Sequence, residues 1–114
     1  MSNFKPRCKS DPKVAVLADA LKALADPTRL MILCLLRDGE ACVCDVEGQL
    51  GISQQLTSHH LHVLKEAGIL HMRKVGTMRF YSINREFLKT VNQAFNEYLD
   101  WRKVKEKKRE GVVC

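Results

Sequence analysis

The side chains of this sequence that are best suited to binding an ion belong to Cys42 and Cys44, two cysteines separated by a single residue. Thiolates are soft ligands, and sites built from them select thiophilic ions. The spacing is shorter than the two to four residues between the paired cysteines of zinc fingers, and it is not the Cys-x-x-Cys spacing of thioredoxin-like enzymes. On a regular helix the two side chains point about 200° apart. One ion therefore binds both sulfurs only if the first turn of the helix is distorted, and such ligation would pull on that helix.

The other cysteines do not form a disulfide framework. The chain has 114 residues and five cysteines, an odd number without a regular spacing. The N-terminus has no apolar segment typical of a secretory signal, and no apolar run approaches the roughly 18 residues that span a membrane. We therefore expect a cytoplasmic protein with reduced thiols. Cys34 lies within a continuous apolar segment, and we expect it to be a small residue of the core.

Polar side chains of the types by which proteins contact DNA bases are concentrated in residues 53–67. Glutamine bonds adenine in a bidentate manner, and serine reaches either a base edge or a phosphate. His59 and His62 stand three residues apart, which suits a shared metal ion, but we favour a DNA-facing role for them. His60 points away from both, and we expect a partly buried imidazole whose hydrogen bonds are satisfied. The residues of this segment predicted to contact DNA are Ser53, Gln54, Gln55, Ser58, His59 and His62.

The formal net charge of +6 is distributed unevenly along the chain. Residues 65–85 contain five basic residues and one acidic residue, whereas residues 14–64 contain three basic and six acidic residues. Both ends of the chain are also basic, which solvation explains as well as contact with a partner does. Within the basic segment, Arg73, Lys74 and Arg79 are the predicted phosphate contacts. A solvated surface would account for their charge, but not for its concentration beside an acidic body.

Apolar spacing, capping residues and turn residues predict the elements that must position these side chains. The order is α-α-α-α-β-β-α, which is mainly helical with a small β-hairpin and indicates a winged helix-turn-helix. The hairpin is the wing, and it coincides with the basic segment. The predicted elements span residues 14–24, 28–37, 42–50, 53–67, 69–75, 78–83 and 84–101.

Capping residues and apolar stripes define the helices more closely. Asp26, Ser53 and Asn84 are each suited to cap the helix that follows them. The apolar run 30–36 indicates a helix that is buried on most sides. The inner face of the helix 53–67 is predicted to consist of Leu56, Leu61, Leu64 and Ala67.

The first and last helices carry more apolar residues than a monomer of this size needs. Packing on the chain's own core explains this as well as pairing of two chains does. Because DNA readers of this type dimerise to match two half-sites about 34 Å apart, we expect a homodimer formed through these two helices. The chain then divides into an N-terminal tail (1–12), a winged helix-turn-helix domain for DNA binding and dimerisation (13–103) and a basic C-terminal tail (104–114).

Four segments of the chain carry a resemblance to a known family. Residues 24–30 read Leu-Ala-Asp-Pro-Thr-Arg-Leu and residues 40–46 read Glu-Ala-Cys-Val-Cys-Asp-Val, and the other two segments are 50–61 and 64–70. Together they resemble the ArsR/SmtB family of winged-helix, metal-responsive repressors, over about residues 14–100. The resemblance implies a homodimer that binds double-stranded operator DNA when free of inducer and releases it when the ion binds.

The cysteine segment is similar to the motif of the arsenical-responsive branch of that family, and also to cadmium/lead sensors. The arsenical motif has a third cysteine where this chain has Glu47. Trivalent arsenic prefers three thiolates, so a third must come from elsewhere or the site has two. Cys8 resembles the tail cysteines that complete a site on the other subunit in the cadmium/lead sensors, and we favour it. Cys114 is the other candidate, and an uninvolved surface thiol is the alternative for both.

The family's second type of site lies on the last helix and holds zinc, nickel or cobalt with Asp, His and Glu. No histidine follows His71 in this chain, which argues against a zinc or nickel sensor. The leading hypothesis is therefore a DNA-binding transcriptional repressor without a permanent cofactor. It would release its operator when As(III) or Sb(III) binds the thiolates of Cys42, Cys44 and Cys8.

Three alternatives stand beside this hypothesis. The same fold could sense Cd(II) or Pb(II), or the oxidation of its thiols. A protein-interaction module without DNA contact would make the charge of the wing incidental. A thiol enzyme needs a base positioned beside its nucleophile, and since the histidines have other predicted roles, we expect no enzyme.

Overall fold

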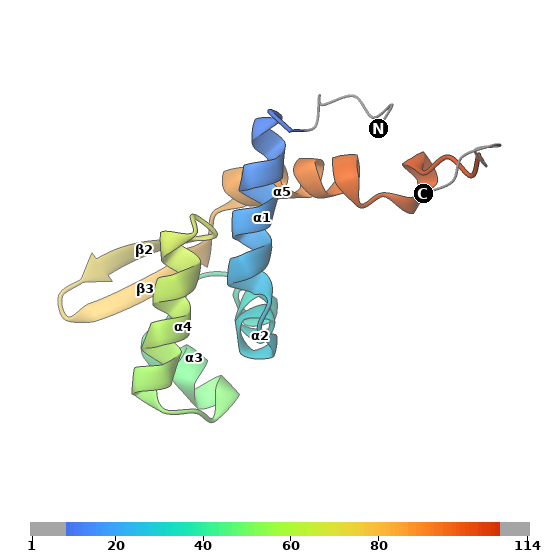
Figure 1. The fold of residues 1–114 in the computed structure, drawn as a ribbon. Helices are drawn as coiled ribbons and strands as arrows, with labels where there is room; N and C mark the ends of the chain where they lie inside the picture. Colours follow the sequence, from blue (N-terminus) through green and yellow to red (C-terminus); the bar gives the residue numbers. More distant parts are fainter. Residues whose placement is uncertain (1–8, 108–114) are drawn as a thin grey trace.

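A computed structural model describes residues 9–107 as five α-helices, a small antiparallel sheet and a short 3₁₀ helix (Figure 1). The order of the elements confirms the predicted winged helix-turn-helix. Within these residues, no helix has the length and apolar character needed to cross a membrane. The elements are α1 (Pro12–Leu24), α2 (Pro27–Leu36), β1 (Ala41–Cys42), α3 (Val43–Leu50), α4 (Gln54–Glu66), β2 (Leu70–Val75), β3 (Met78–Ile83), α5 (Arg85–Tyr98) and η2 (Trp101–Lys103).

The three predicted N-caps are confirmed. Asp26, Ser53 and Asn84 each accept a hydrogen bond from a backbone amide in the first turn of α2, α4 and α5 respectively. These bonds satisfy donors that a helix cannot pair internally. Between α3 and α4, Gly51 has a φ of 67°, and this left-handed conformation makes the turn of the helix-turn-helix.

The sheet has three antiparallel strands in the order β1-β3-β2. The hairpin of β2 and β3 is the predicted wing. Strand β1 was not predicted, because residue 42 was expected to begin a helix; instead Ala41 pairs with Tyr81 and Cys42 pairs with Phe80. Two residues are too few to show the alternation by which a strand is recognised in a sequence.

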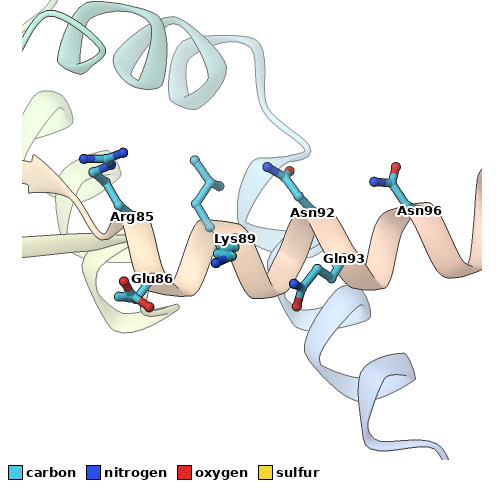
Figure 2. Close-up of a pocket in the computed structure, with 7 residues that line it drawn as sticks. Arg85, Glu86, Lys89, Asn92, Gln93 and Asn96 are labelled. Carbon is cyan, nitrogen blue, oxygen red and sulfur yellow. The ribbon is translucent and has the colours of Figure 1, made fainter.

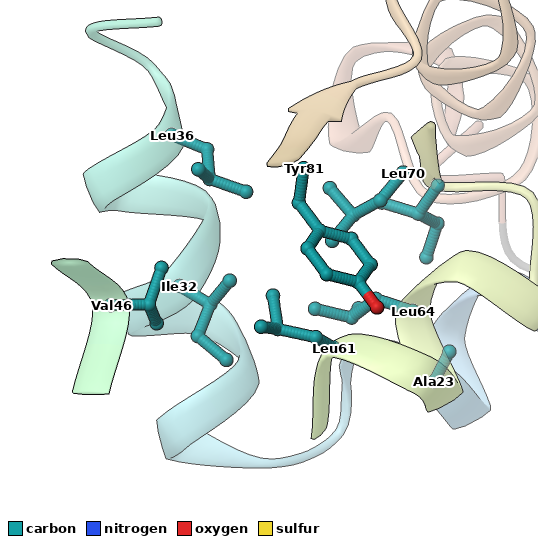
Figure 3. Close-up of a cluster of buried hydrophobic side chains, with 9 residues drawn as sticks. Ala23, Ile32, Leu36, Val46, Leu61, Leu64, Leu70 and Tyr81 are labelled. Atoms are coloured by element: carbon teal, nitrogen blue, oxygen red, sulfur yellow. The ribbon is translucent and has the colours of Figure 1, made fainter. Parts of the chain in front are cut away.

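A buried apolar cluster holds α4 against α2, α3 and the sheet (Figure 3). Leu61 and Leu64 of α4 are completely buried there, beside Ile32 of α2 and Tyr81 of β3. Helix α4, the predicted reading helix, and the wing therefore share one core. A second cluster packs α1 against α5 and consists of Leu17, Ala20, Val91 and Ala94.

Helix α2 is buried on one side only. Ile32 and Leu36 face the core, but Leu30, Met31 and Cys34 are exposed. The predictions that this run is buried on most sides and that Cys34 belongs to the core are therefore wrong. A continuous apolar run covers every side of a helix, but the neighbouring elements within residues 9–107 pack against only one side of α2.

The inner face of α4 differs from the prediction at one position. Leu56 is 44% exposed, and Thr57 is fully buried. The Thr57 Oγ1 donates a hydrogen bond of 2.8 Å to the Ser53 carbonyl oxygen. Because its hydroxyl is satisfied within the helix, a polar residue occupies a position that the apolar pattern had assigned to Leu56.

The last helix ends at Tyr98, so its predicted extension to Trp101 is wrong. Asp100 accepts a hydrogen bond of 3.0 Å from the Arg102 amide and starts a separate 3₁₀ helix. Trp101 is consequently 81% exposed. An apolar period continued through this segment, but the local cap interrupts the helix.

Candidate functional site

Cys42 is the N-cap of α3 and is not itself helical, with φ −84° and ψ 165°. Its Sγ accepts a hydrogen bond of 3.4 Å from the Asp45 amide, and its own amide donates one of 3.3 Å to Asp45 Oδ2. These reciprocal bonds form a capping box. Because Cys42 precedes the helix and Cys44 lies in its first turn, the divergence of two side chains on a regular helix does not apply. The expected obstacle to a shared ion is absent.

The Cys42 thiol is almost completely buried, whereas Cys44 is exposed. A hydrogen bond from the Asp45 amide lowers the pKa of the Cys42 thiol, but burial, the Asp45 carboxylate and a hydrogen bond with Cys44 outweigh it and raise the net pKa above the ordinary cysteine value. Sequence reasoning missed Asp45. An acidic residue three positions after a helix-starting residue is the signal that would have found it.

Both cysteines line a hollow of about 320 Å³ that also reaches the helix-turn-helix and the wing. Gln54 and Ser58 of α4 border it on one side, and Arg79 of β3 borders it on another. Three predicted DNA contacts and the predicted ion-binding pair thus meet around one space. Val43, Thr77 and Met78 complete its lining, and the sequence had not singled them out.

The other predicted contacts on α4 lie on its open surface. Gln55, His59 and His62 are exposed, and so is Ser53, whose Oγ is engaged in capping at 3.1 Å from the Leu56 amide. His60 is buried as expected. The expectation that its hydrogen bonds are satisfied is wrong, since its Nδ1 has no partner among residues 9–107.

The three basic residues of the wing do not share one face of the sheet. Lys74 pairs directly with Arg79, so their side chains lie on the same face, while Arg73 pairs with Phe80 and lies on the other. Two like charges opposite one another repel. A phosphate between Lys74 and Arg79 would relieve that repulsion. All three arginine and lysine side chains are exposed.

Neither candidate for the third thiolate can be placed, since Cys8 and Cys114 lie outside the described residues. Within residues 9–107, no three His, Cys, Asp or Glu side chains are grouped as a metal site requires. Cys42 and Cys44 nevertheless fit a thiophilic ion, because two adjacent sulfurs border an open hollow.

A larger hollow of about 570 Å³ runs along the outer side of α5, but its lining does not suit a metal ion. Glu86 is the one carboxylate in the lining, which contains no histidine or cysteine. Figure 2 shows Arg85 and Asn96 on one side of α5 and Glu86 and Gln93 on the other, so these polar groups do not converge.

The fold, with two thiols beside its helix-turn-helix, defines the class of winged-helix transcriptional regulators. Residues 26–71 match the family described as bacterial regulatory protein, arsR family. The arsenical resistance operon repressor of Staphylococcus xylosus is 43% identical to the chain over 68% of the chain and 74% of that protein. A cadmium resistance transcriptional regulatory protein CadC homolog of Staphylococcus aureus is also 43% identical, over 69% of the chain and 67% of that protein.

A solved structure of a possible transcriptional regulator for arsenical resistance superimposes with a TM-score of 0.66 and 34% identity. The superposition covers 70% of this chain and 83% of the chain in the solved structure. The chain therefore belongs to the ArsR/SmtB family of transcriptional repressors. Repressors of this family bind operator DNA and metal ions.

Proposed function

We propose that this repressor releases its operator when As(III) or Sb(III) binds the thiols of Cys42 and Cys44, with Cys8 as the third ligand. The observation that carries the proposal is the shared hollow, which both cysteines line together with Gln54, Ser58 and Arg79. Each thiol that binds arsenous acid gives its proton to a departing hydroxyl, so an As–S bond forms and one water leaves. The name of the Staphylococcus xylosus relative supports arsenic as the ion.

Ligation would act on DNA binding through the start of α3. If the Cys42 sulfur turns toward the ion, the hydrogen bond that it accepts from the Asp45 amide would be strained. The capping box would then weaken, and α3, which supports α4, would lose its fixed beginning. The ion also occupies space beside Gln54, Ser58 and Arg79, where base edges and phosphates would lie.

The proposed DNA surface consists of the N-cap and the polar side of α4, together with the wing. Lys74 and Arg79 contact phosphates from one face of the sheet, and the exposed polar residues of α4 contact bases and phosphates in the major groove. The proposed contacts from α4 are Ser53, Gln54, Gln55, Ser58, His59 and His62.

A homodimer formed through α1 and α5 completes the proposal. Val14 and Leu21 of α1 and Phe95 of α5 are exposed although they are apolar. Leu99 and Trp101 extend this surface beyond α5. A second copy of the chain would bury these side chains and place two reading helices for two half-sites.

The DNA contacts predict a steep salt dependence. Lys74 and Arg79 in two subunits neutralise four phosphates, so the logarithm of the affinity should fall with the logarithm of salt concentration with a slope of roughly −3 to −4. Fluorescence anisotropy on a duplex selected by the protein from a random pool measures this slope. Lys74→Gln should reduce its magnitude by about 1.8, one contact per subunit. An unchanged slope in that variant would remove Lys74 from the phosphate contacts.

Cd(II) is the second candidate, because a relative is named for cadmium resistance, and pH distinguishes the two ions. Cd(II) displaces protons from the thiols, so its affinity should rise with pH by about tenfold per unit for each proton displaced. The raised pKa of Cys42 extends this rise above the ordinary thiol range. Arsenous acid releases water instead of protons, so its affinity should stay level while the thiols are protonated.

Isothermal titration of each ion at several pH values measures both profiles. Asp45→Asn removes the carboxylate that raises the Cys42 pKa, and should shift the Cd(II) profile to lower pH. Operator release by Cd(II) but not by arsenite would establish cadmium as the inducer and overturn the arsenic proposal.

A further inference from the structure

Arg73 is held by the segment that precedes the ion-binding cysteines. Its Nε donates to Glu40 Oε2 and its Nη2 donates to Glu40 Oε1, both at 2.7 Å. Such a bidentate pair fixes the plane and the direction of the guanidinium. The Arg73 guanidinium holds the pKa of the Glu40 carboxyl below its usual range, so the pair is fully charged at neutral pH.

The pair crosses the whole sheet. Because the strand order is β1-β3-β2, an arginine of β2 reaches Glu40, next to β1, only by passing over β3. It does so above Phe80, whose ring centroid lies 5.0 Å from the Arg73 Cζ. The cationic group therefore contacts an aromatic face as well as a carboxylate. Both contacts hold it away from the face that carries Lys74 and Arg79.

The same row of the sheet contains the buried cysteine. Cys42 and Arg73 both pair with Phe80, so the three side chains lie on one face. Glu40 is two residues before Cys42 and belongs to that face too. Strand β1 consists of Ala41 and Cys42 alone. A displacement of Cys42 consequently moves half of the strand and, with it, the anchor of Arg73.

We propose that Arg73 is a positioning residue, which fixes the wing for DNA binding through Glu40, and not a phosphate contact. The Glu40–Arg73 pair is also the connection by which an ion at Cys42 and Cys44 disturbs the wing, and this second part rests on the proposed ion site. The acidic partner is thus required for DNA binding, although it adds negative charge near the DNA surface.

Glu40→Gln separates the two roles by the sign of its effect. If Arg73 contacts phosphate, removing the carboxylate frees the guanidinium and strengthens binding. If Arg73 positions the wing, Glu40→Gln weakens binding by roughly tenfold. Glu66→Gln, which removes one acidic charge at the far end of α4, is the matched control and should leave the affinity almost unchanged. Stronger binding by Glu40→Gln would overturn the proposal.

The double variant and the salt slope provide independent readouts. Arg73→Gln should weaken binding about as much as Glu40→Gln, and the double variant no more than either, because all three break one interaction. The slope of log affinity against log salt should stay at the wild-type value in Arg73→Gln, whereas each lost phosphate contact changes it by about 0.9. Additive losses or a reduced slope would contradict a positioning role.

The role of the pair in the response to ions is tested by adding arsenite or Cd(II), in separate experiments, to the full-length protein bound to the selected duplex. In Glu40→Gln, absorption from sulfur–ion bonds should show binding as in the wild type, while the ratio of DNA affinities without and with ion falls toward one. A wild-type ratio in this variant would exclude the pair as the connection. If neither ion binds the wild-type protein, the proposed inducer is wrong, but the sign and slope experiments without ion still decide the positioning role.

Discussion

Replacing Cys42 and Cys44 by serine together is expected to abolish the release of DNA by arsenite while leaving DNA binding intact. Coupling between two sites is typically 1–3 kcal/mol, so arsenite should lower the DNA affinity of the wild type by roughly 5- to 150-fold. In the double variant this ratio should be about one. Anisotropy of a labelled duplex, with and without arsenite, measures both values.

Serine is a suitable replacement because of the role that Cys42 has in the fold. Cys42 begins α3 by accepting a hydrogen bond from the Asp45 amide, and serine is a preferred residue at such an N-cap. The substitution should therefore preserve the capping box and remove the sulfur alone. Circular dichroism would verify that the helices are retained.

Cys34→Ser is the matched control for the loss of a thiol. Cys34 is exposed on α2 and does not line the hollow. This variant should respond to arsenite as the wild type does. If instead the Cys42→Ser/Cys44→Ser protein still released DNA normally and Cys34→Ser did not, the sensing thiols would lie on α2.

Leu61→Ala is expected to be strongly destabilising, because this side chain lies at the centre of the core beneath α4. Leu61 is completely buried in the cluster that joins α4 to α2 and the sheet. Truncating a buried leucine to alanine costs about 2–5 kcal/mol of unfolding free energy, because packing is lost and a cavity is left. The total free energy of unfolding of a small domain is about 5–15 kcal/mol. Urea unfolding at a fixed protein concentration measures the loss.

The neighbouring Leu56→Ala is the control, because Leu56 is on the same helix and is half exposed. It should lose less than about 1 kcal/mol, as expected for a surface position. Equal losses in the two variants would mean that Leu56 is buried in the protein as it exists in solution, for example against a second copy. The loss in Leu61→Ala alone would confirm that the core sets the position of α4.

The helices were largely predictable because their signals are local. Asp26, Ser53 and Asn84 cap the helices that follow them, and apolar spacing of 3.6 residues shows which side of a helix meets the core. The errors occurred where burial depends on what the rest of the fold brings near. Cys34 is as apolar as its neighbours, but no element among residues 9–107 covers its side of α2.

The candidate site was predictable in its residue types and less so in its geometry. The spacing of Cys42 and Cys44, the polar residues of α4 and the basic wing are all visible in the amino-acid order. The two-residue strand β1 is not, because it exists only through its pairing with β3. That pairing makes Cys42 a cap instead of a helical residue, and so allows the two thiols to lie together.

The charges of the wing show the same division. The sequence alone established that Arg73, Lys74 and Arg79 form a basic cluster beside a helix-turn-helix, since charge is a property of residue type. Which of them lie on the same face depended on the sheet, because strand register places Lys74 and Arg79 on one face and Arg73 on the other. Glu40 stands 33 positions before Arg73, and no local pattern relates them. Their contact follows from the strand order β1-β3-β2, which brings the two segments to opposite sides of β3.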